Sequence, residues 1–160
     1  MDTTEIIIEP GRQDIVFKRT FDAPRDLVYR ALTDPQLVPK YWGPRRFTTE
    51  VDHMEVRQGG RWRFVQRDND GNTFAFKGVY HDAVPSERII STFEWEGMPG
   101  HVSLDTATLE EVDGKTQYTA VSVFQSLADR DGVVQSGMEG GARELYERLA
   151  EVIAGMLSRA

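Results

Sequence analysis

Between residues 47 and 124 the chain alternates apolar and polar side chains in six runs separated only by short turns. This period of two is typical of β-strands. The predicted strands cover residues 47–56, 60–67, 73–82, 87–96, 102–112 and 115–124. Asp70-Gly71 and Asp113-Gly114 are strong hairpin signals, because aspartate and glycine tolerate the positive φ of tight turns. Parallel neighbours would need crossovers of about a dozen residues, so the pattern predicts an antiparallel meander.

Another strand and two short helices are expected before the meander. Residues 12–21 alternate in the same way and predict the first strand. Pro24 suits the first position of a helix, and an apolar stripe follows it. Asp34-Pro35 repeats this start signal and predicts a second short helix that stops near Pro39.

The C-terminal segment has the periodicity of a long helix. Its apolar residues recur at steps of three and four, so they would share one face. These residues are Met138, Ala142, Leu145, Leu149, Val152 and Met156. The opposite face would expose the i,i+4 pairs Glu144–Arg148 and Arg143–Glu147 to water.

Three glycines and an alanine lie between Ser136 and Ala142, at the start of this helix. Glycine inside a helix costs about 1 kcal/mol relative to alanine, so the stretch requires either a helix break or a close neighbour. One interpretation is that the slim end leaves a cavity beneath the helix. The alternative, that Gly137 ends one helix before another begins, fits this residue equally well but fits Gly140 and Gly141 less well.

One face of the predicted sheet is aromatic. Trp62 and Phe64 would point to one side of their strand, whereas Arg61 and Arg63 would point to the other. A sheet with one apolar face must cover it, and only the C-terminal helix is long enough to do so. We therefore expect an α+β fold in which a curved antiparallel sheet surrounds that helix.

The space between the slim helix end and the sheet is the predicted site for a small apolar or amphipathic ligand. Its mouth is expected at the loop that begins with Trp42, and a few polar groups would orient the ligand. The candidate ligand-binding residues are Trp42, Trp62, Phe64, Gln66, Phe74, Phe76, Tyr80, Phe93, Trp95, Tyr118, Met138, Gly141, Ala142 and Leu145. Most of the aromatic residues among them are also expected to serve as core.

The bulk properties exclude several classes of partner. A formal net charge of -7 opposes attraction to nucleic acid, because phosphate binding depends on lysine and arginine. No apolar run approaches the roughly 20 residues that cross a bilayer, and the first residues lack signal-peptide character. We expect a cytoplasmic protein with no membrane span, built as one domain over residues 1–160 with a loose segment at 1–11. It would be a monomer or a homodimer.

Four motifs, in this order, resemble a known family. They are Tyr41–Pro44, Val56–Phe64, Gly78–Tyr80 with Pro85–Ile89, and Ser136–Ala142 continuing to Leu149. Over residues 12–158 the chain resembles START-like (SRPBCC, helix-grip) proteins, and within them bacterial single-domain relatives of the activator of the 90-kDa heat-shock chaperone ATPase. The resemblance implies a sheet of about seven strands wrapped around a long C-terminal helix, with two short helices between strands 1 and 2. It also implies an apolar ligand cavity, or a chaperone partner and a role in the stress response.

Family members often carry a tryptophan near the position of Ala142. The small side chain in this sequence implies a roomier cavity.

Sequence motifs for catalysis are sparse. The chain has no cysteine, no Gly-x-Ser-x-Gly elbow, no phosphate-binding glycine loop and no His-Glu-x-x-His helix. His53, His81 and His101 lack the paired spacing of a metal site, so no metal and no cofactor are expected.

Asp105 is the weak candidate for chemistry. Strand alternation would place it on the inner face with Ala107 and Leu109, although its position near the strand start favours exposure to solvent. If it pointed inwards near His101 and Tyr118, an acid/base pair for enol or cyclisation chemistry would be conceivable.

Three functions follow as hypotheses. The first is binding of a small apolar or amphipathic ligand by a protein that is non-catalytic, weakly catalytic or of unknown activity. The second is a chaperone ATPase-regulating interaction module. The third is a polyketide cyclase- or hydrolase-like enzyme.

Overall fold

The fold is an α+β arrangement in which one curved antiparallel sheet is covered by helices. The computed structural model describes residues 3–159. The strands are β1 (Glu5–Ile7), β2 (Asp14–Phe21), β3 (Thr48–Met54), β4 (Arg61–Arg67), β5 (Thr73–Val84), β6 (Arg88–Trp95), β7 (Val102–Val112) and β8 (Lys115–Phe124). The helices are α1 (Arg25–Thr33), the 3-10 helix η1 (Val38–Lys40), α2 (Leu127–Gln135) and α3 (Met138–Ser158). The strand order is β1-β2-β8-β7-β6-β5-β4-β3, and all neighbours are antiparallel.

The predicted meander is confirmed, and two of its strands have the expected bounds. β7 and β8 cover the segments 102–112 and 115–124 that the alternation predicted. Asp113 and Gly114 join them with φ of 54° and 76°, the paired positive values of a type I′ turn. The remaining strands of the meander shift by one or two residues at their ends.

The strand count of about seven is wrong, because the sheet has eight strands. The additional strand is β1, which lies within the segment 1–11 that was expected to be loose. It pairs with β2 at the sheet edge, with Glu5 opposite Lys18. A three-residue strand is too short for a period of two to reveal it.

The helices before and after the meander also differ from expectation. α1 begins directly after Pro24, close to the predicted start. The second short helix ends near Pro39 as expected, because η1 ends at Lys40. It begins at Val38 instead of after Asp34-Pro35, and Pro39 lies in its first turn, where the missing N–H leaves no partner unsatisfied. α2 was not predicted as a separate element, and the side chain of Ser126 caps its start by accepting from the Asp129 N–H.

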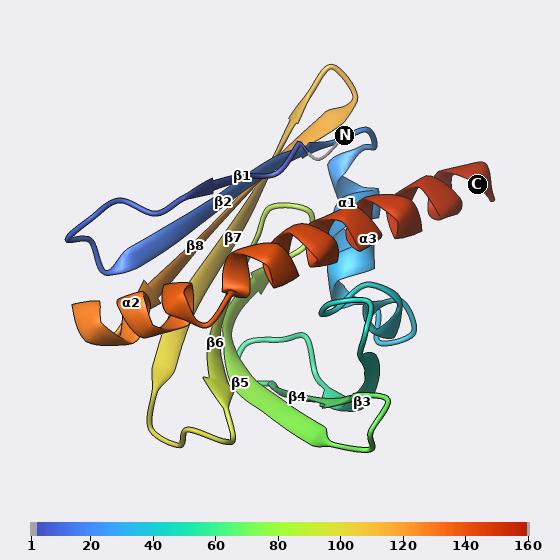
Figure 1. Ribbon diagram of the computed structural model, residues 1–160. Coiled ribbons are helices and arrows are strands. Elements are labelled where there is room, and N and C mark those ends of the chain that lie inside the picture. The colour runs from blue at the N-terminus through green and yellow to red at the C-terminus, as the bar shows by residue number, and fades with distance from the viewer. Residues whose placement is uncertain (1–2, 160) are drawn as a thin grey trace.

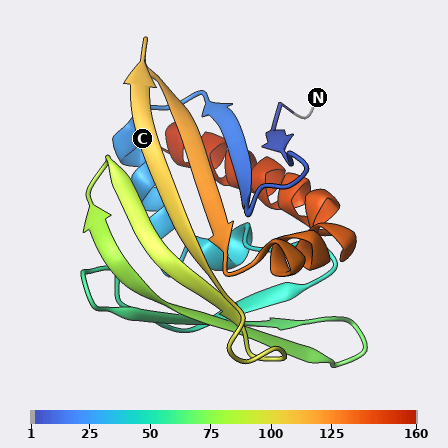
Figure 2. The same ribbon diagram turned by 90° about the vertical axis from the view of Figure 1, so that its left-hand side faces the viewer.

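The long helix α3 crosses the concave face of the sheet, as Figures 1 and 2 show from two directions. Its C-terminal half is sealed against the core, because Leu149, Ile153 and Met156 are buried. Leu109 of β7 belongs to the same apolar core. No helix in the described residues is long and apolar enough to cross a membrane.

The ion pairs predicted along α3 are replaced by other contacts. Arg143 forms its i,i+4 pair with Glu139, at 3.3 Å, instead of with Glu147. Arg148 donates to the carbonyl oxygens of Lys40, the last residue of η1, and of Gly43 and Pro44. The polar face of α3 therefore contributes to tertiary structure as well as to solubility.

Gly137 is the junction between α2 and α3. Its φ is 86°, in the left-handed region that glycine adopts without steric cost, and it follows the C-cap Ser136 of α2. The alternative that Gly137 ends one helix before another begins is therefore confirmed. Gly140 lies inside α3 and has ordinary helical geometry, so its freedom is not used in the same way.

The two glycines should respond to alanine with opposite signs. Gly137→Ala should lower the free energy of unfolding by about 1 to 2 kcal/mol, because an L-residue is strained in the left-handed conformation. Gly140→Ala should raise it by up to about 1 kcal/mol, since alanine restricts the unfolded chain and meets nothing within 4 Å. Urea unfolding measures both values, and two changes of the same sign would contradict this junction geometry.

Candidate functional site

A cavity of two adjoining chambers lies between the first half of α3 and the sheet. The outer chamber, under the start of α3, has a volume of about 550 Å³. The inner chamber, of about 220 Å³, lies deeper and reaches Leu32 of α1 and Val38 of η1. The walls common to both chambers are Phe17, Trp42, Phe93, Asp105, Ser122, Leu145 and Tyr146.

Every candidate ligand-binding residue lines at least one of these chambers. Trp62, Phe64, Tyr80 and Tyr118 line the inner chamber; Gln66, Phe74, Phe76, Trp95, Met138, Gly141 and Ala142 line the outer one; Trp42, Phe93 and Leu145 line both. Their role in binding a ligand stays a prediction, whereas their common location is now established by the fold.

The two neighbouring glycines of α3 face different surroundings. A side chain at Gly141 would begin 3.4 Å from Cγ of Pro44, in the loop that forms the opposite wall. At Gly140 it would meet nothing within 4 Å, and this residue is exposed. The distance at Gly141 is an ordinary van der Waals contact, so Gly141 faces the cavity wall without a neighbour that demands glycine. The interpretation that both glycines make room is wrong for Gly140, which has no neighbour within 4 Å.

Trp42 is the aromatic centre of the cavity wall. Its ring centroid lies 5.1 Å from that of Phe64 and 5.1 Å from that of Phe76, both in edge-on geometry. Trp62 and Phe93 extend the same cluster across β4 and β6. Because such contacts stabilise aromatic side chains in fixed orientations, this wall is preformed.

The loop after η1 is tied to α3 by charged side chains. Arg148 Nη1 donates to the Gly43 carbonyl at 2.7 Å, and its Nη2 donates to the Lys40 carbonyl at 2.9 Å. The Arg45 N–H donates to Glu144 Oε2 at 2.9 Å. These bonds fix the position of the loop that carries Trp42. This wall of the outer chamber is therefore attached to α3, which covers the chamber.

Asp105 lies on the inner face of β7, in the wall shared by the two chambers. The sheet register places it between Ser91 of β6 and Ser122 of β8, which makes a polar row across three strands. The Ser103 hydroxyl donates to Asp105 Oδ1 at 3.1 Å. Because Asp105 lines both chambers, the alternative that it faces solvent is wrong.

The environment of Asp105 disfavours its charge. Burial raises the pKa of this carboxyl to about 6, and hydrogen bonds from Ser122 and Ser103 lower it by a smaller amount. Its remaining accessible surface borders the cavity. At neutral pH the cavity therefore contains a mostly ionised carboxylate within largely apolar walls.

A pair of buried tyrosines adjoins this carboxylate. The hydroxyl oxygens of Tyr118 on β8 and Tyr146 on α3 are 3.1 Å apart and share one hydrogen bond. Burial raises the pKa of Tyr118 to about 12, and the nearby Asp105 also contributes to the increase. Both phenols are neutral at physiological pH, so they can donate hydrogen bonds but hold no charge.

His101 does not join Asp105 and Tyr118, so the predicted trio is incomplete. Its Nδ1 lies 3.1 Å from Asp129 of α2, and its side chain is half exposed. It borders a groove of about 380 Å³ between the β6–β7 loop and α2, which adjoins the outer chamber through shared residues such as Trp95 and Ser103. Within residues 3–159, no group of three or more His, Cys, Asp or Glu side chains is placed to hold a metal ion.

The sequence analysis missed part of the cavity wall. The missed residues include Phe17, Tyr41, Ile89, Ser91, Ser103 and Tyr146. Tyr146 could have been found, because steps of four and three join it to Ala142 and Leu149 on one helical stripe. Ser91 and Ser103 become recognisable only once the strand register is known.

Fold and cavity together define a START-like helix-grip protein of the bacterial single-domain kind. Residues 22–154 match the family described as activator of Hsp90 ATPase homolog 1-like protein. Because this match covers most of the chain, the protein belongs to that family. The comparison with curated proteins finds no match.

Solved structures from several bacteria share this fold. A protein of Rhodobacter sphaeroides is 29% identical, with a TM-score of 0.86 over 94% of this chain and 99% of that one. A protein of Chromobacterium violaceum is 26% identical, with a TM-score of 0.76 over 88% and 96% of the two chains. A protein of Arthrobacter aurescens reaches a TM-score of 0.88 over 94% and 91%, and at 21% identity it bears on the fold alone.

Replacing Asp105 by asparagine should stabilise the ligand-free protein at neutral pH. The folded-state pKa near 6 lies above the unfolded value of 3.8, so stability falls as the pH rises through this interval and the carboxyl ionises. The loss amounts to at most about 3 kcal/mol. Urea unfolding between about pH 4 and pH 8 should show that the advantage of Asp105→Asn grows up to about pH 6 and then levels off. An advantage that does not vary with pH would contradict a buried, titrating carboxylate.

Proposed function

We propose that the protein binds a small apolar or amphipathic molecule in the two chambers between the sheet and α3. The observation that carries this proposal is the outer chamber of about 550 Å³ under the glycine-containing start of α3. Protein interiors are normally close-packed, and unfilled apolar volume lowers stability. The outer chamber is unfilled and partly open to solvent, so a ligand could enter it and cover its apolar walls.

The composition of the walls supports the same proposal. Ligand sites are typically apolar and aromatic, with a few polar groups that fix orientation. Trp42, Phe76 and Phe93 supply the apolar surface of the outer chamber, and Gln66 and Asp105 supply polar atoms. Gln66 is buried, so its amide is held within the wall and does not extend into solvent.

Ala142→Trp tests the proposal by filling the outer chamber from its roof. The indole should lower the affinity for the uncharged dye N-phenyl-1-naphthylamine by at least about tenfold, which is about 1.4 kcal/mol of binding free energy. Fluorescence titration measures the affinity, and circular dichroism verifies that the variant is folded.

Ala154→Trp is the matched control, because it makes the same change at an exposed position of the same helix that lines neither chamber. It should bind the dye like the unmodified protein. Equal dye affinity in folded Ala142→Trp and Ala154→Trp would contradict binding in the outer chamber.

Enzymatic activity of cyclase or hydrolase type is a second candidate, favoured by the inward carboxyl of Asp105. A carboxylate in a largely apolar site, with a pKa near 6, has the properties of a general base. Tyr118 could donate a hydrogen bond to a substrate oxygen in the inner chamber. Mass spectrometry of a host metabolite extract incubated with the protein should then reveal a conversion that Asp105→Asn abolishes. Identical extracts would contradict this candidate.

Regulation of a chaperone ATPase is a further prediction, and it rests on the family description. Its test is capture of the host's 90-kDa heat-shock chaperone together with a change in its ATPase rate. Failure of both measurements would contradict it.

A further inference from the structure

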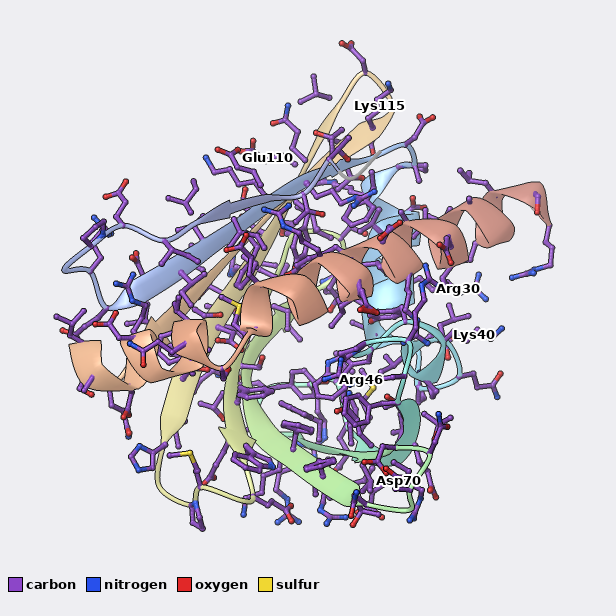
Figure 3. All side chains as sticks on the ribbon, viewed as in Figure 1. Arg30, Lys40, Arg46, Asp70, Glu110 and Lys115 are labelled. Atoms are coloured by element: carbon purple, nitrogen blue, oxygen red, sulfur yellow. The ribbon has the colours of Figure 1, made fainter. Side chains whose placement is uncertain are left out.

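Asp105 is distinctive among the residues that line the cavity. Within the described part of the chain, it is the one carboxylate in the walls of the two chambers, and Arg46 is the one cationic side chain. Arg46 is exposed, lies over the Phe47 ring at 4.8 Å and is labelled below α3 in Figure 3. The inner part of the cavity therefore has negative character and its mouth has positive character.

The protein satisfies only part of the hydrogen-bonding capacity of this carboxylate. An ionised carboxylate offers about four acceptor positions. Ser103 occupies one of them at 3.1 Å, and Ser122 is the other hydroxyl that hydrogen-bonds the group. Because Asp105 lines both chambers, a bound molecule could supply donors to the remaining positions.

The chemistry of the surrounding walls selects among possible donors. A buried carboxylate is stabilised most by a positively charged donor, because charge and hydrogen bonds then act together. Trp42, Phe93 and Tyr146 line the same two chambers as Asp105. Aromatic faces attract ammonium groups, so they and the carboxylate favour the same kind of ligand.

We infer that the ligand is an amphipathic amine, with its ammonium group at Asp105 and its apolar body along Trp42, Phe93 and Leu145. This inference rests on the proposed function and adds the chemical class of the ligand. Carboxylic acids of the same length would bring a second negative charge next to Asp105 and are disfavoured. An acid could enter only with its charge held outside, near Arg46.

Three probes that share the same alkyl chain and differ in the charge of the head group test the inference. They are octylammonium, octanol and octanoate. Isothermal titration calorimetry at about pH 8, where Asp105 and the amine are both ionised, should give the tightest binding for octylammonium. Asp105→Asn should weaken octylammonium binding by about tenfold or more, because it removes a charge-assisted hydrogen bond, and should leave octanol within about twofold. Asparagine keeps the shape of the side chain and an acceptor for Ser103.

Asp113→Asn is the matched control, since it makes the same chemical change in the β7–β8 turn away from both chambers. It should leave all three affinities unchanged. Asp105→Asn and Asp113→Asn should unfold in urea with the same cooperativity as the unmodified protein. A folding defect would then be excluded as the cause of weaker octylammonium binding.

Three results would overturn the inference, and the first two leave the proposed function intact. One is equal binding of octylammonium by the unmodified protein and Asp105→Asn. The second is preference for octanoate, which would place recognition at Arg46. Absence of binding by all three probes would overturn the inference, and only the additional failure of the neutral dye would overturn the proposed function.

Discussion

The architecture depends on one requirement, that a single helix must cover the concave face of an eight-stranded sheet. Only the C-terminal half of α3 makes a sealed contact, through Leu149, Ile153 and Met156. Its N-terminal half starts at the Gly137 junction and passes over Ala142 with little side-chain volume. The cavity is the part of the concave face that α3 covers without filling, and the bonds of Arg148 hold the opposite wall in place.

Local chemistry made most of the fold predictable. Alternation identified every strand of the meander, and the Asp113-Gly114 turn fixed the register of its last hairpin. β1 was missed because three residues carry no measurable period, and its place beside β2 depends on tertiary contacts. α2 was missed because Gly132 and several polar residues interrupt its apolar pattern, so its helical state depends on packing against β8 and α3.

The candidate site was predictable where it depends on side-chain type and face. Aromatic residues such as Trp62 and Phe64 followed directly from strand alternation. Tyr146 was missed because the stripe through Leu145 and Val152 was chosen, although the overlapping stripe through Tyr146 and Ile153 fits the same helical period. The direction of the Asp105 side chain was left open, because a one-residue slip in register would turn it to the other face of the sheet. That register depends on pairing with the neighbouring strands. Its isolation from His101 likewise follows from the path of the β6–β7 loop.

A crystal structure with a bromine-tagged octylamine would test most directly the claim that this cavity is a ligand site. The bromine can be located from its anomalous signal, so the position does not depend on interpreting weak density. The account predicts bromine between the sheet and the first half of α3, with the amine nitrogen within hydrogen-bonding distance of Asp105. A cavity closed by its own side chains, or bromine bound only on the outside of the protein, would contradict it.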